Sequence, residues 1–120
     1  MRKSKINRKT NETEIFCSVN LDGTGKSEIS TNIGFFDHMF EILSHHSLVD
    51  IELKVTGDIH VDLHHSVEDA GYVFAQSIIK ALGEKRGIKR YGFYYIPMDE
   101  CLSRCVIDFS GRPELVWNVN

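Results

Sequence analysis

The order of hydrophobic periodicities along the chain constrains its fold more than any other feature of the sequence. Strands alternate apolar and polar residues, whereas amphipathic helices repeat apolar residues at intervals of three or four. The first pattern predicts strands over residues 14–20, 26–31 and 49–56, and the second predicts helices over 35–46 and 64–82. Strands and helices are therefore mixed in this part of the chain, which favours an α+β fold.

Glycines mark the ends of several of these elements. Asp22-Gly-Thr-Gly25 lies between residues 14–20 and 26–31, so these two strands are expected to form a hairpin. Gly83 is placed to end the second helix. Gly71 lies inside that helix and lowers its intrinsic stability, so we expect another element to approach it closely.

The last third of the chain contains strand patterns only. The predicted strands cover residues 91–96, 102–108 and 115–119, and no helical pattern follows them. A sheet without helices leaves a face uncovered, which requires further chain or another subunit. We therefore expect residues 1–85 to form a complete α+β half-domain and residues 86–120 to be the opening strands of a second, truncated one.

The composition disfavours several classes of protein. Apolar residues make up 42% of the chain and charged residues 26%, which is typical of a globular fold rather than a disordered one. The net charge is -3, whereas nucleic-acid-binding proteins usually carry a basic excess. No apolar stretch is long enough to span a membrane or to follow residues 1–5 as a secretory signal. Three cysteines without a disulfide framework are expected to be reduced and buried, in a cytoplasmic protein.

The histidines are clustered in one part of the chain. All of them fall within residues 38–65, at His38, His45, His46, His60, His64 and His65. Histidine is the commonest transition-metal ligand in proteins, and a carboxylate often accompanies it. The cluster therefore favours a metal site over a scatter of surface histidines.

The sequence His64-His-Ser-Val-Glu68 opens the second predicted helix. His64 and Glu68 are four residues apart and share one helical face, whereas His65 is offset by about 100°. We therefore expect the two histidines to serve two different ions, with Asp69 as an acceptor for an imidazole N–H. The alternative is a solvated helix N-terminus, because this motif is less specific than His-Glu-x-x-His.

His38 lies on the earlier predicted helix and can meet His65 if the two helices lie side by side. Together with His64 and Glu68, these residues offer about two ligands for each of two ions, fewer than the four to six that such metals require. The remaining ligands must come from another subunit, substrate, water or further chain. Mixed imidazole and carboxylate ligands suit Mn, Fe or Zn.

Eight segments, taken in order over nearly the whole chain, resemble the imidazoleglycerol-phosphate dehydratase family. They are Arg8-Lys-Thr-Asn-Glu-Thr13, Asn20-Leu-Asp-Gly-Thr-Gly25, Ile33-Gly-Phe-Phe-Asp-His-Met39, Gly57-Asp58, His64-His-Ser-Val-Glu-Asp69, Arg90-Tyr-Gly92, Pro97-Met-Asp-Glu100 and Asp108-Phe-Ser-Gly-Arg-Pro113. The resemblance implies a duplicated fold, in which each half is a four-stranded sheet packed on two helices in the manner of ribosomal protein S5 domain 2. It also implies homo-oligomers of about 24 subunits and two Mn²⁺ ions per active site, although other divalent metals are possible.

The resemblance assigns roles to individual residues. His38, His64, His65 and Glu68 match the metal ligands of the first half of the family's fold. Glu12 matches a carboxylate of the family that is implicated in proton transfer. His46 and Asp99 match further catalytic or active-site positions. Arg90 and Arg112 match residues that hold the substrate phosphate, and a planar guanidinium suits that group well. Without the resemblance, both arginines would be interpreted as surface charges.

The implied reaction removes water from imidazole glycerol phosphate to give imidazole acetol phosphate, a step in histidine biosynthesis. The family's chains are longer and carry a second His-His-x-x-Glu helix, so we expect the 120 residues alone to have little or no activity. Two kinds of alternative remain open at this point. One is a mononuclear zinc hydrolase, and the other is a non-catalytic assembly module or an RNA-binding domain of related topology. The expected partners are a small phosphate substrate and other copies of the chain, without nucleic acid or membrane.

Overall fold

The computed structural model describes residues 1–119, and these residues divide into two compact units. Unit 1 spans Met1–Glu84, and unit 2 begins at Lys85. The division lies one residue from the boundary expected from the periodicities. That unit 2 opens a second half-domain stays a prediction.

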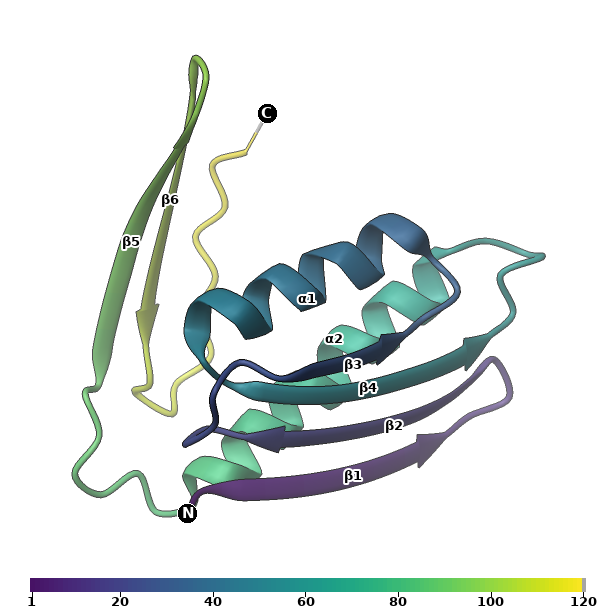
Figure 1. Ribbon diagram of the computed structural model, residues 1–120, viewed down its shortest axis with the longest axis horizontal. Coiled ribbons are helices and arrows are strands. Elements are labelled where there is room, and N and C mark those ends of the chain that lie inside the picture. Colours follow the sequence, from purple (N-terminus) through teal and green to yellow (C-terminus); the bar gives the residue numbers. More distant parts are fainter. Residues whose placement is uncertain (120) are drawn as a thin grey trace. The chain divides into compact units, whose positions relative to one another are not determined.

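Unit 1 is a four-stranded sheet with two helices on one face, which confirms the expected α+β half-domain (Figure 1). Its sheet has the order β1-β2-β4-β3, in which β3 and β4 are parallel and the other neighbours are antiparallel. The elements of unit 1 are β1 (Lys3–Lys9), β2 (Thr13–Asn20), β3 (Ser27–Ser30), α1 (Gly34–Ser47), β4 (Asp50–Gly57) and α2 (His64–Leu82).

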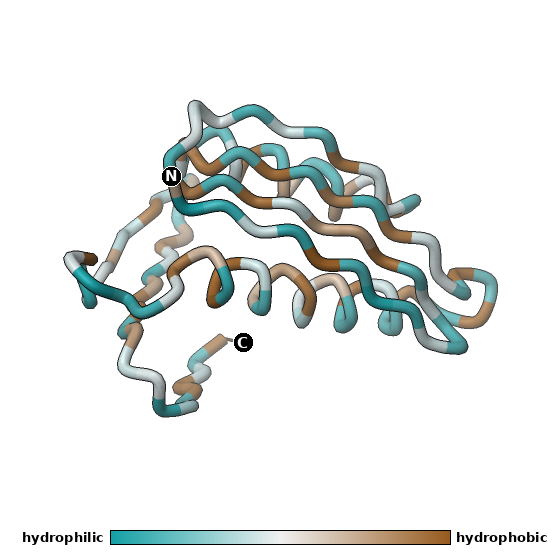
Figure 2. Tube along the Cα trace, turned by 90° about the horizontal axis from the view of Figure 1, so that it is seen from below, coloured by the Kyte–Doolittle hydropathy of each residue, from teal (hydrophilic) through white to brown (hydrophobic). Residues whose placement is uncertain are grey.

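The two central strands supply the apolar side of the sheet. Their residues alternate between buried and more exposed positions, and this alternation is visible along the strands in Figure 2. Because β2 and β4 are paired in register, their buried residues face one another across the ladder. The pairs are Ile15 with Val55, Cys17 with Leu53, and Val19 with Ile51.

The expected hairpin between residues 14–20 and 26–31 is wrong. The second of these strands forms as β3, but it pairs with β4 and not with β2. The carboxylate of Asp50 accepts the backbone N–H groups of Thr24 and Lys26, each at 2.9 Å. These bonds hold the connecting loop at the start of β4, so that β4 lies between the two strands.

Strand β1 was not predicted from the sequence. It pairs with β2 from Lys3 to Lys9, but its buried residue, Ser4, is polar, and of its half-buried residues, Ile6 and Arg8, only Ile6 is apolar. An edge strand with so few inward apolar residues does not show the alternation on which the prediction depends.

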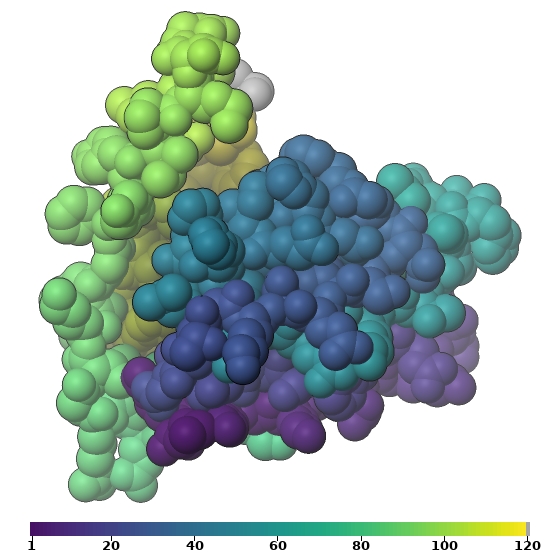
Figure 3. Space-filling model, viewed as in Figure 1, coloured from purple at the N-terminus to yellow at the C-terminus, as the bar shows by residue number. Residues whose placement is uncertain are grey.

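Helix α1 packs on the sheet through Phe40, and the half-buried Phe36 lies against the same core. Phe40 and Ser44 are buried, whereas Met39 and Leu43 remain 45% and 43% exposed. In the space-filling view, α1 (blue) forms much of the surface of unit 1 that faces the viewer (Figure 3). The outward apolar residues of α1 are thus not covered by the rest of unit 1.

Helix α2 packs on the sheet through small side chains. Its buried residues are Ser66, Ala70, Val73, Ser77 and Ala81. The expected close approach at Gly71 is wrong, because a Cβ added there meets no atom within 4 Å. The expected stop at Gly83 is confirmed, since its N–H donates to the carbonyl of Ile79 at 3.2 Å.

Unit 2 is an antiparallel hairpin of β5 (Tyr91–Met98) and β6 (Cys101–Asp108). All residues of both strands are exposed, including Cys101 and Cys105, so the expected burial holds only for Cys17. The predicted strand over 115–119 is wrong, because these residues are irregular. A strand requires a neighbouring edge, and within residues 85–119 only β5 and β6 are paired. No helix among the described residues has the length and apolar character needed to cross a membrane.

Candidate functional site

The topology of unit 1 gathers several candidate residues at one edge of its sheet. Because β3 and β4 are parallel, the helices that follow them begin at the same edge (Figure 1). Strand β2 runs the other way and starts there, with Thr13 opposite Gly57. We call this the histidine edge; it contains Glu12, His38, Asp58, His64, His65 and Glu68.

His65 is held by a carboxylate that comes from the end of β4. Its Nδ1 lies 2.9 Å and 3.1 Å from the two carboxylate oxygens of Asp58. This hydrogen bond is the main cause of the raised pKa of His65, and the charges of Glu12 and Glu68 raise it further. Both glutamates therefore act on the same imidazole ring.

His64 has an equivalent but more open arrangement. Its Nδ1 lies 3.3 Å from the carboxylate of Asp62, and both side chains are more than half exposed. The rings of His64 and His65 lie side by side, with centroids 4.2 Å apart and planes inclined by 53°. Because each Nδ1 faces an aspartate, the Nε2 atoms are the nitrogens left to bind a metal.

Asp69 does not accept an imidazole N–H, as the sequence interpretation expected. It instead accepts the hydroxyl of Thr13 at 2.6 Å and forms an ion pair with Arg8 at 3.1 Å. The Thr13 hydrogen bond is the main cause of the lowered pKa of Asp69, and the charge of Arg8 adds to it. Asp69 thus ties the start of β2 to the first turns of α2, and the Arg8 guanidinium also lies over the Tyr72 ring.

Sequence reasoning missed the aspartates that serve the two rings. Asp58 and Asp62 precede the histidine pair in the spacing Gly57-Asp-x-x-x-Asp-x-His-His65. The signal was present, because two carboxylates stand shortly before two adjacent imidazoles. The conformation of the loop between β4 and α2 decides which ring each carboxylate reaches.

Glu12 lies in a tight turn between β1 and β2. The Thr10 hydroxyl accepts the N–H groups of Glu12 at 3.2 Å and of Thr13 at 3.1 Å. The carbonyl of Glu12 accepts the N–H of Asp58 at 3.1 Å. The backbone of Glu12 is therefore fixed, while its side chain is exposed.

The histidine edge carries donors for a transition metal but does not complete a metal site. Imidazole and carboxylate groups are the donor set that suits Mn, Fe or Zn. Within residues 1–119, however, no group of three or more such side chains is arranged to hold an ion. His38 and Glu68 are exposed on their helices. The structure thus supports the histidine edge as part of a site and leaves the individual ligand assignments as predictions.

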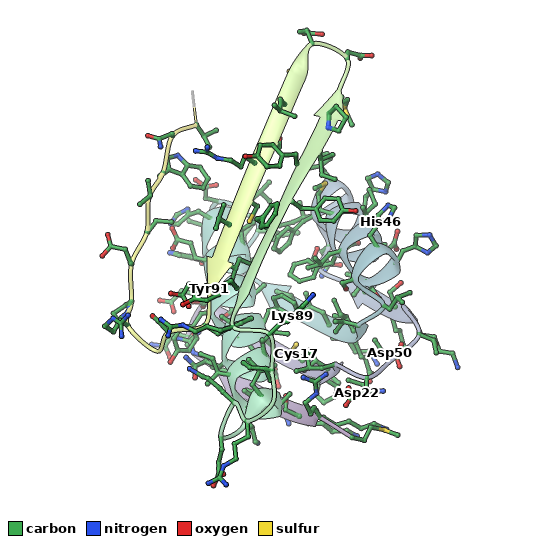
Figure 4. All side chains as sticks on the ribbon, turned by 90° about the vertical axis from the view of Figure 1, so that its left-hand side faces the viewer. Cys17, Asp22, His46, Asp50, Lys89 and Tyr91 are labelled. Carbon is green, nitrogen blue, oxygen red and sulfur yellow. The ribbon has the colours of Figure 1, made fainter. Side chains whose placement is uncertain are left out.

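His46 lies away from the histidine edge. It is in the last turn of α1, eight residues beyond His38, which corresponds to about 12 Å along the helix axis. Figure 4 shows His46 at the surface of α1, where its ring meets that of His45 with centroids 5.1 Å apart. A single chain therefore does not bring His46 to Glu12 or His65.

The predicted phosphate-binding arginines lie near one end of the hairpin of unit 2. Arg90 binds Asp108 through Nε at 2.7 Å and Nη2 at 3.2 Å. This hydrogen bond is the main cause of the lowered pKa of Asp108, and the charge of Arg112 lowers it further. Two guanidinium groups thus act on one carboxylate, an arrangement that can also receive a dianionic phosphate.

Asp99 lies at the opposite end of the same hairpin. It follows Met98 in the turn between β5 and β6. Met98 is seven residues from Tyr91, which corresponds to about 23 Å along β5. Asp99 and Arg90 of one chain are therefore too far apart to contact one small substrate.

Comparison with known proteins identifies the family. The model of the family described as imidazoleglycerol-phosphate dehydratase matches residues 31–120. The chain belongs to the imidazoleglycerol-phosphate dehydratase family. The family resemblance seen in the eight sequence segments is thereby confirmed.

Imidazoleglycerol-phosphate dehydratases from two bacteria are among the most similar relatives. The protein from Agrobacterium fabrum is 56% identical over 119 residues, which cover 99% of this chain and 60% of the relative. A Cereibacter sphaeroides protein is 54% identical and is covered to 61%. The chain thus spans about 60% of the length of these relatives.

A solved structure supports the fold of the family. The crystal structure of imidazoleglycerol-phosphate dehydratase from Staphylococcus aureus matches with a TM-score of 0.84 and 35% sequence identity. The match covers 98% of this chain and 64% of the other. The α+β architecture is thereby that of the imidazoleglycerol-phosphate dehydratase fold.

Proposed function

We propose that the protein to which this chain belongs removes water from imidazole glycerol phosphate to give imidazole acetol phosphate in histidine biosynthesis. The observation that supports this most is the histidine edge, where two adjacent imidazoles each face an aspartate and the charge of Glu12 acts on His65, in a chain of this family. The site offers acid–base groups and metal donors together, and both are useful for removing a proton that is not acidic.

The residues that would hold the metal are His38, His64, His65 and Glu68. Mn²⁺, proposed at two ions per active site, would stabilise negative charge on the imidazole of the substrate. Asp58 and Asp62 hold the Nδ1 sides of the two histidines, so that each Nε2 is free to bind. Other divalent metals fit the same donors.

Glu12 is proposed to move the proton. Its exposed carboxylate sits on a backbone fixed by Thr10 and Asp58, so that it can take the carbon-bound proton of a substrate held at the histidine edge. The electron pair left by that C–H bond forms the new double bond as the C–O bond breaks. The leaving hydroxyl takes up a proton from the now protonated Glu12 or from an imidazolium of the histidine edge, and it departs as water. The enol that is formed then loses the proton of its hydroxyl and gains one at the carbon next to the imidazole ring, which gives the ketone of imidazole acetol phosphate. His46 and Asp99 lie away from the histidine edge, and they are proposed to line active sites that are formed with other copies of the chain.

Arg90 and Arg112 are proposed to bind the phosphate of the substrate. Arg90 already forms a two-pronged contact with the Asp108 carboxylate, and a phosphate oxygen pair can be bound in the same manner. Fixing the phosphate restricts the carbon chain and places the reacting carbons against the acid–base groups.

We also propose that the protein assembles into a large homo-oligomer, of about 24 subunits, in the cytoplasm. The positions of two candidate residues support assembly. Within one chain, His46 is too far along α1 to meet His65, and Asp99 is at the opposite end of the hairpin from Arg90. The missing ligands would then come from other copies or from the part of the relatives that this chain does not span.

The test is an activity assay on the intact protein, in which metal is removed with a chelator and Mn²⁺ is returned. We expect formation of imidazole acetol phosphate to disappear and then to recover. His65→Ala is expected to lower activity at least about 100-fold and to prevent metal-dependent assembly, because it removes an imidazole ligand. His60→Ala is the matched control, because it removes an exposed imidazole in the preceding turn.

Three outcomes would contradict the proposal. The first is a metal-free protein that keeps full activity, and the second is a His65→Ala variant that assembles and binds two ions as the parent does. The third is a single zinc ion per site with hydrolase activity, which would favour the mononuclear zinc hydrolase instead. A large oligomer that has no catalytic activity, detected by mass measurement, would instead favour the assembly module.

A further inference from the structure

Asp58 is the residue at which three elements of unit 1 meet. It follows the last residue of β4, and its side chain is only 19% exposed. Its carbonyl accepts the N–H of Val61 at 2.8 Å, which closes the turn toward α2. Its N–H donates to Glu12 and its carboxylate binds His65. Every polar group of Asp58 therefore has a partner.

The carboxylate of Asp58 determines which nitrogen of His65 is available. An ionised carboxylate only accepts hydrogen bonds, so the Nδ1 that faces it must carry the proton. In the neutral ring, Nε2 then carries the lone pair. A metal ligand of the imidazole type needs such a fixed tautomer and ring orientation.

The backbone of Asp58 sets the position of the Glu12 turn. The hydrogen bond from Asp58 N–H to Glu12 carbonyl is 3.1 Å long and crosses from the end of β4 to the start of β2. The residue before it, Gly57, lies against Ser66 of α2, and a Cβ at Gly57 would overlap the Ser66 hydroxyl. These two contacts fix the position of the Asp58 backbone relative to both Glu12 and α2.

We propose that Asp58 is a positioning residue that sets the Nε2 of His65 and the Glu12 turn in one arrangement. In this role it would act through His65 and Glu12 rather than by binding the substrate or the metal itself. It fixes the ring through its side chain and the glutamate turn through its backbone. A change of its side chain should therefore weaken metal binding at His65 while the backbone link to Glu12 persists. This inference rests on the proposed metal site at the histidine edge.

Asp62 provides a matched comparison within the same loop. It faces Nδ1 of His64 as Asp58 faces Nδ1 of His65, but at 3.3 Å and with both side chains more than half exposed. Water competes more strongly for the groups of an exposed pair, so Asp62 restricts the orientation of the His64 ring less than Asp58 restricts that of His65. The same substitution at the two aspartates separates a positioning role from a general effect of removing negative charge.

The experiment measures Mn²⁺ affinity of the intact protein by competition with a chelator. Asp58→Ala is expected to weaken the affinity about 10-fold to 100-fold. Asp58→Asn keeps an oxygen that accepts the Nδ1 proton, so its loss should be smaller. Asp62→Ala should cost less than Asp58→Ala. Thermal unfolding in the presence of chelator checks that each variant is folded. If Asp58→Ala does not fold, Asp58→Asn takes its place in the comparison with Asp62→Ala.

The order of the variants decides the proposal. It is overturned if Asp58→Ala binds Mn²⁺ as the parent does, if Asp62→Ala loses as much, or if Asp58→Asn loses as much as Asp58→Ala. At saturating Mn²⁺, kcat should recover in Asp58→Asn more than in Asp58→Ala, which a purely structural effect would not produce. If the affinities follow the expected order but no imidazole acetol phosphate forms, the proposed function fails while the positioning role of Asp58 stands.

Discussion

Units 1 and 2 both contain well-formed antiparallel strands, yet only one of them has a core. In unit 1, apolar residues of β2 and β4 are buried beneath two helices, whereas every residue of β5 and β6 is exposed. The difference shows that alternation alone predicts a strand, while burial depends on a second layer of structure. A two-stranded hairpin has no such layer of its own.

The apolar residues of unit 2 are distributed over both faces of its hairpin. Phe93 and Tyr95 lie on one face with ring centroids 6.4 Å apart, and Tyr94 and Ile96 alternate with them on the other. Strands that are apolar on both faces are typical of sheets covered on both sides. Unit 2 therefore has the composition of a buried strand pair, although within residues 85–119 no further layer of structure covers it.

The largest expected difference between the units concerns leucines in their strands. Leu53 of β4 is fully buried and Leu102 of β6 is 65% exposed. We expect Leu53→Ala to lower the free energy of unfolding by about 2–5 kcal/mol, because it leaves a cavity in the core. Leu102→Ala in the same chain should change it by less than about 0.5 kcal/mol.

Urea denaturation of the 120-residue chain, followed by circular dichroism, measures both changes. Equal effects of the two substitutions would show that unit 2 is covered in solution, and the contrast between the units would then be lost. A large effect of Leu53→Ala alone would confirm that unit 1 carries the cooperative unfolding transition.

Glycines in strands provide a second, smaller contrast. A Cβ at Gly57 would overlap Ser66, whereas a Cβ at Gly92 meets no atom within 4 Å. Gly57→Ala is expected to destabilise unit 1 by about 1–3 kcal/mol, because it pushes the start of α2 away from the sheet. Gly92→Ala should be neutral or stabilising by up to about 1 kcal/mol, because alanine loses less backbone entropy.

Denaturation midpoints of the two glycine variants test this contrast, and the Mn²⁺ affinity of the intact protein adds a functional measure. Because Ser66 lies next to His65, Gly57→Ala should also weaken metal binding. If Gly57→Ala leaves both stability and metal affinity unchanged, then the close approach of β4 and α2 does not position the histidine edge.

The same contrast explains which parts of the fold could be predicted. Strands β2 and β4 were predicted to within one residue at each end, because their buried residues alternate strictly. Strand β1 was missed, since its inward residues are Ser4, Ile6 and Arg8, and only Ile6 among them is apolar. The strand predicted over 115–119 has strand-like residues but no paired neighbour within the described chain.

Non-local contacts explain the remaining differences. The pairing of β3 with β4 depends on Asp50, which follows the loop that it binds by more than twenty residues. At the site, His64, His65 and Glu68 were found because they are close in sequence on one helix. Asp58 was missed as their partner because only the folded loop brings it to His65.

The smallest expected effect compares one exposed ion pair in each unit. Asp22 pairs with Arg2 at 2.7 Å in unit 1, and this hydrogen bond lowers the pKa of Asp22 to about 2. In unit 2, the pKa of Asp108 is lowered by its hydrogen bond with Arg90. An unpaired aspartate has a pKa of about 3.9, so each pair contributes stability above that pH. The contribution of Asp22 should be lost as the pH falls from about 4 to about 2.

Asp22→Asn and Asp108→Asn distinguish the two pairs. The urea midpoint of the parent should exceed that of Asp22→Asn at neutral pH, and the difference should vanish near pH 2, since the parent carboxylate is then protonated. Asp108→Asn should leave this midpoint unchanged and only speed amide exchange in β5 and β6. A pH-independent difference for Asp22→Asn would assign its effect to something other than the charge. A midpoint shift in Asp108→Asn would mean that the hairpin unfolds together with unit 1, which makes this weakest effect the most sensitive test of whether the two units are energetically separate.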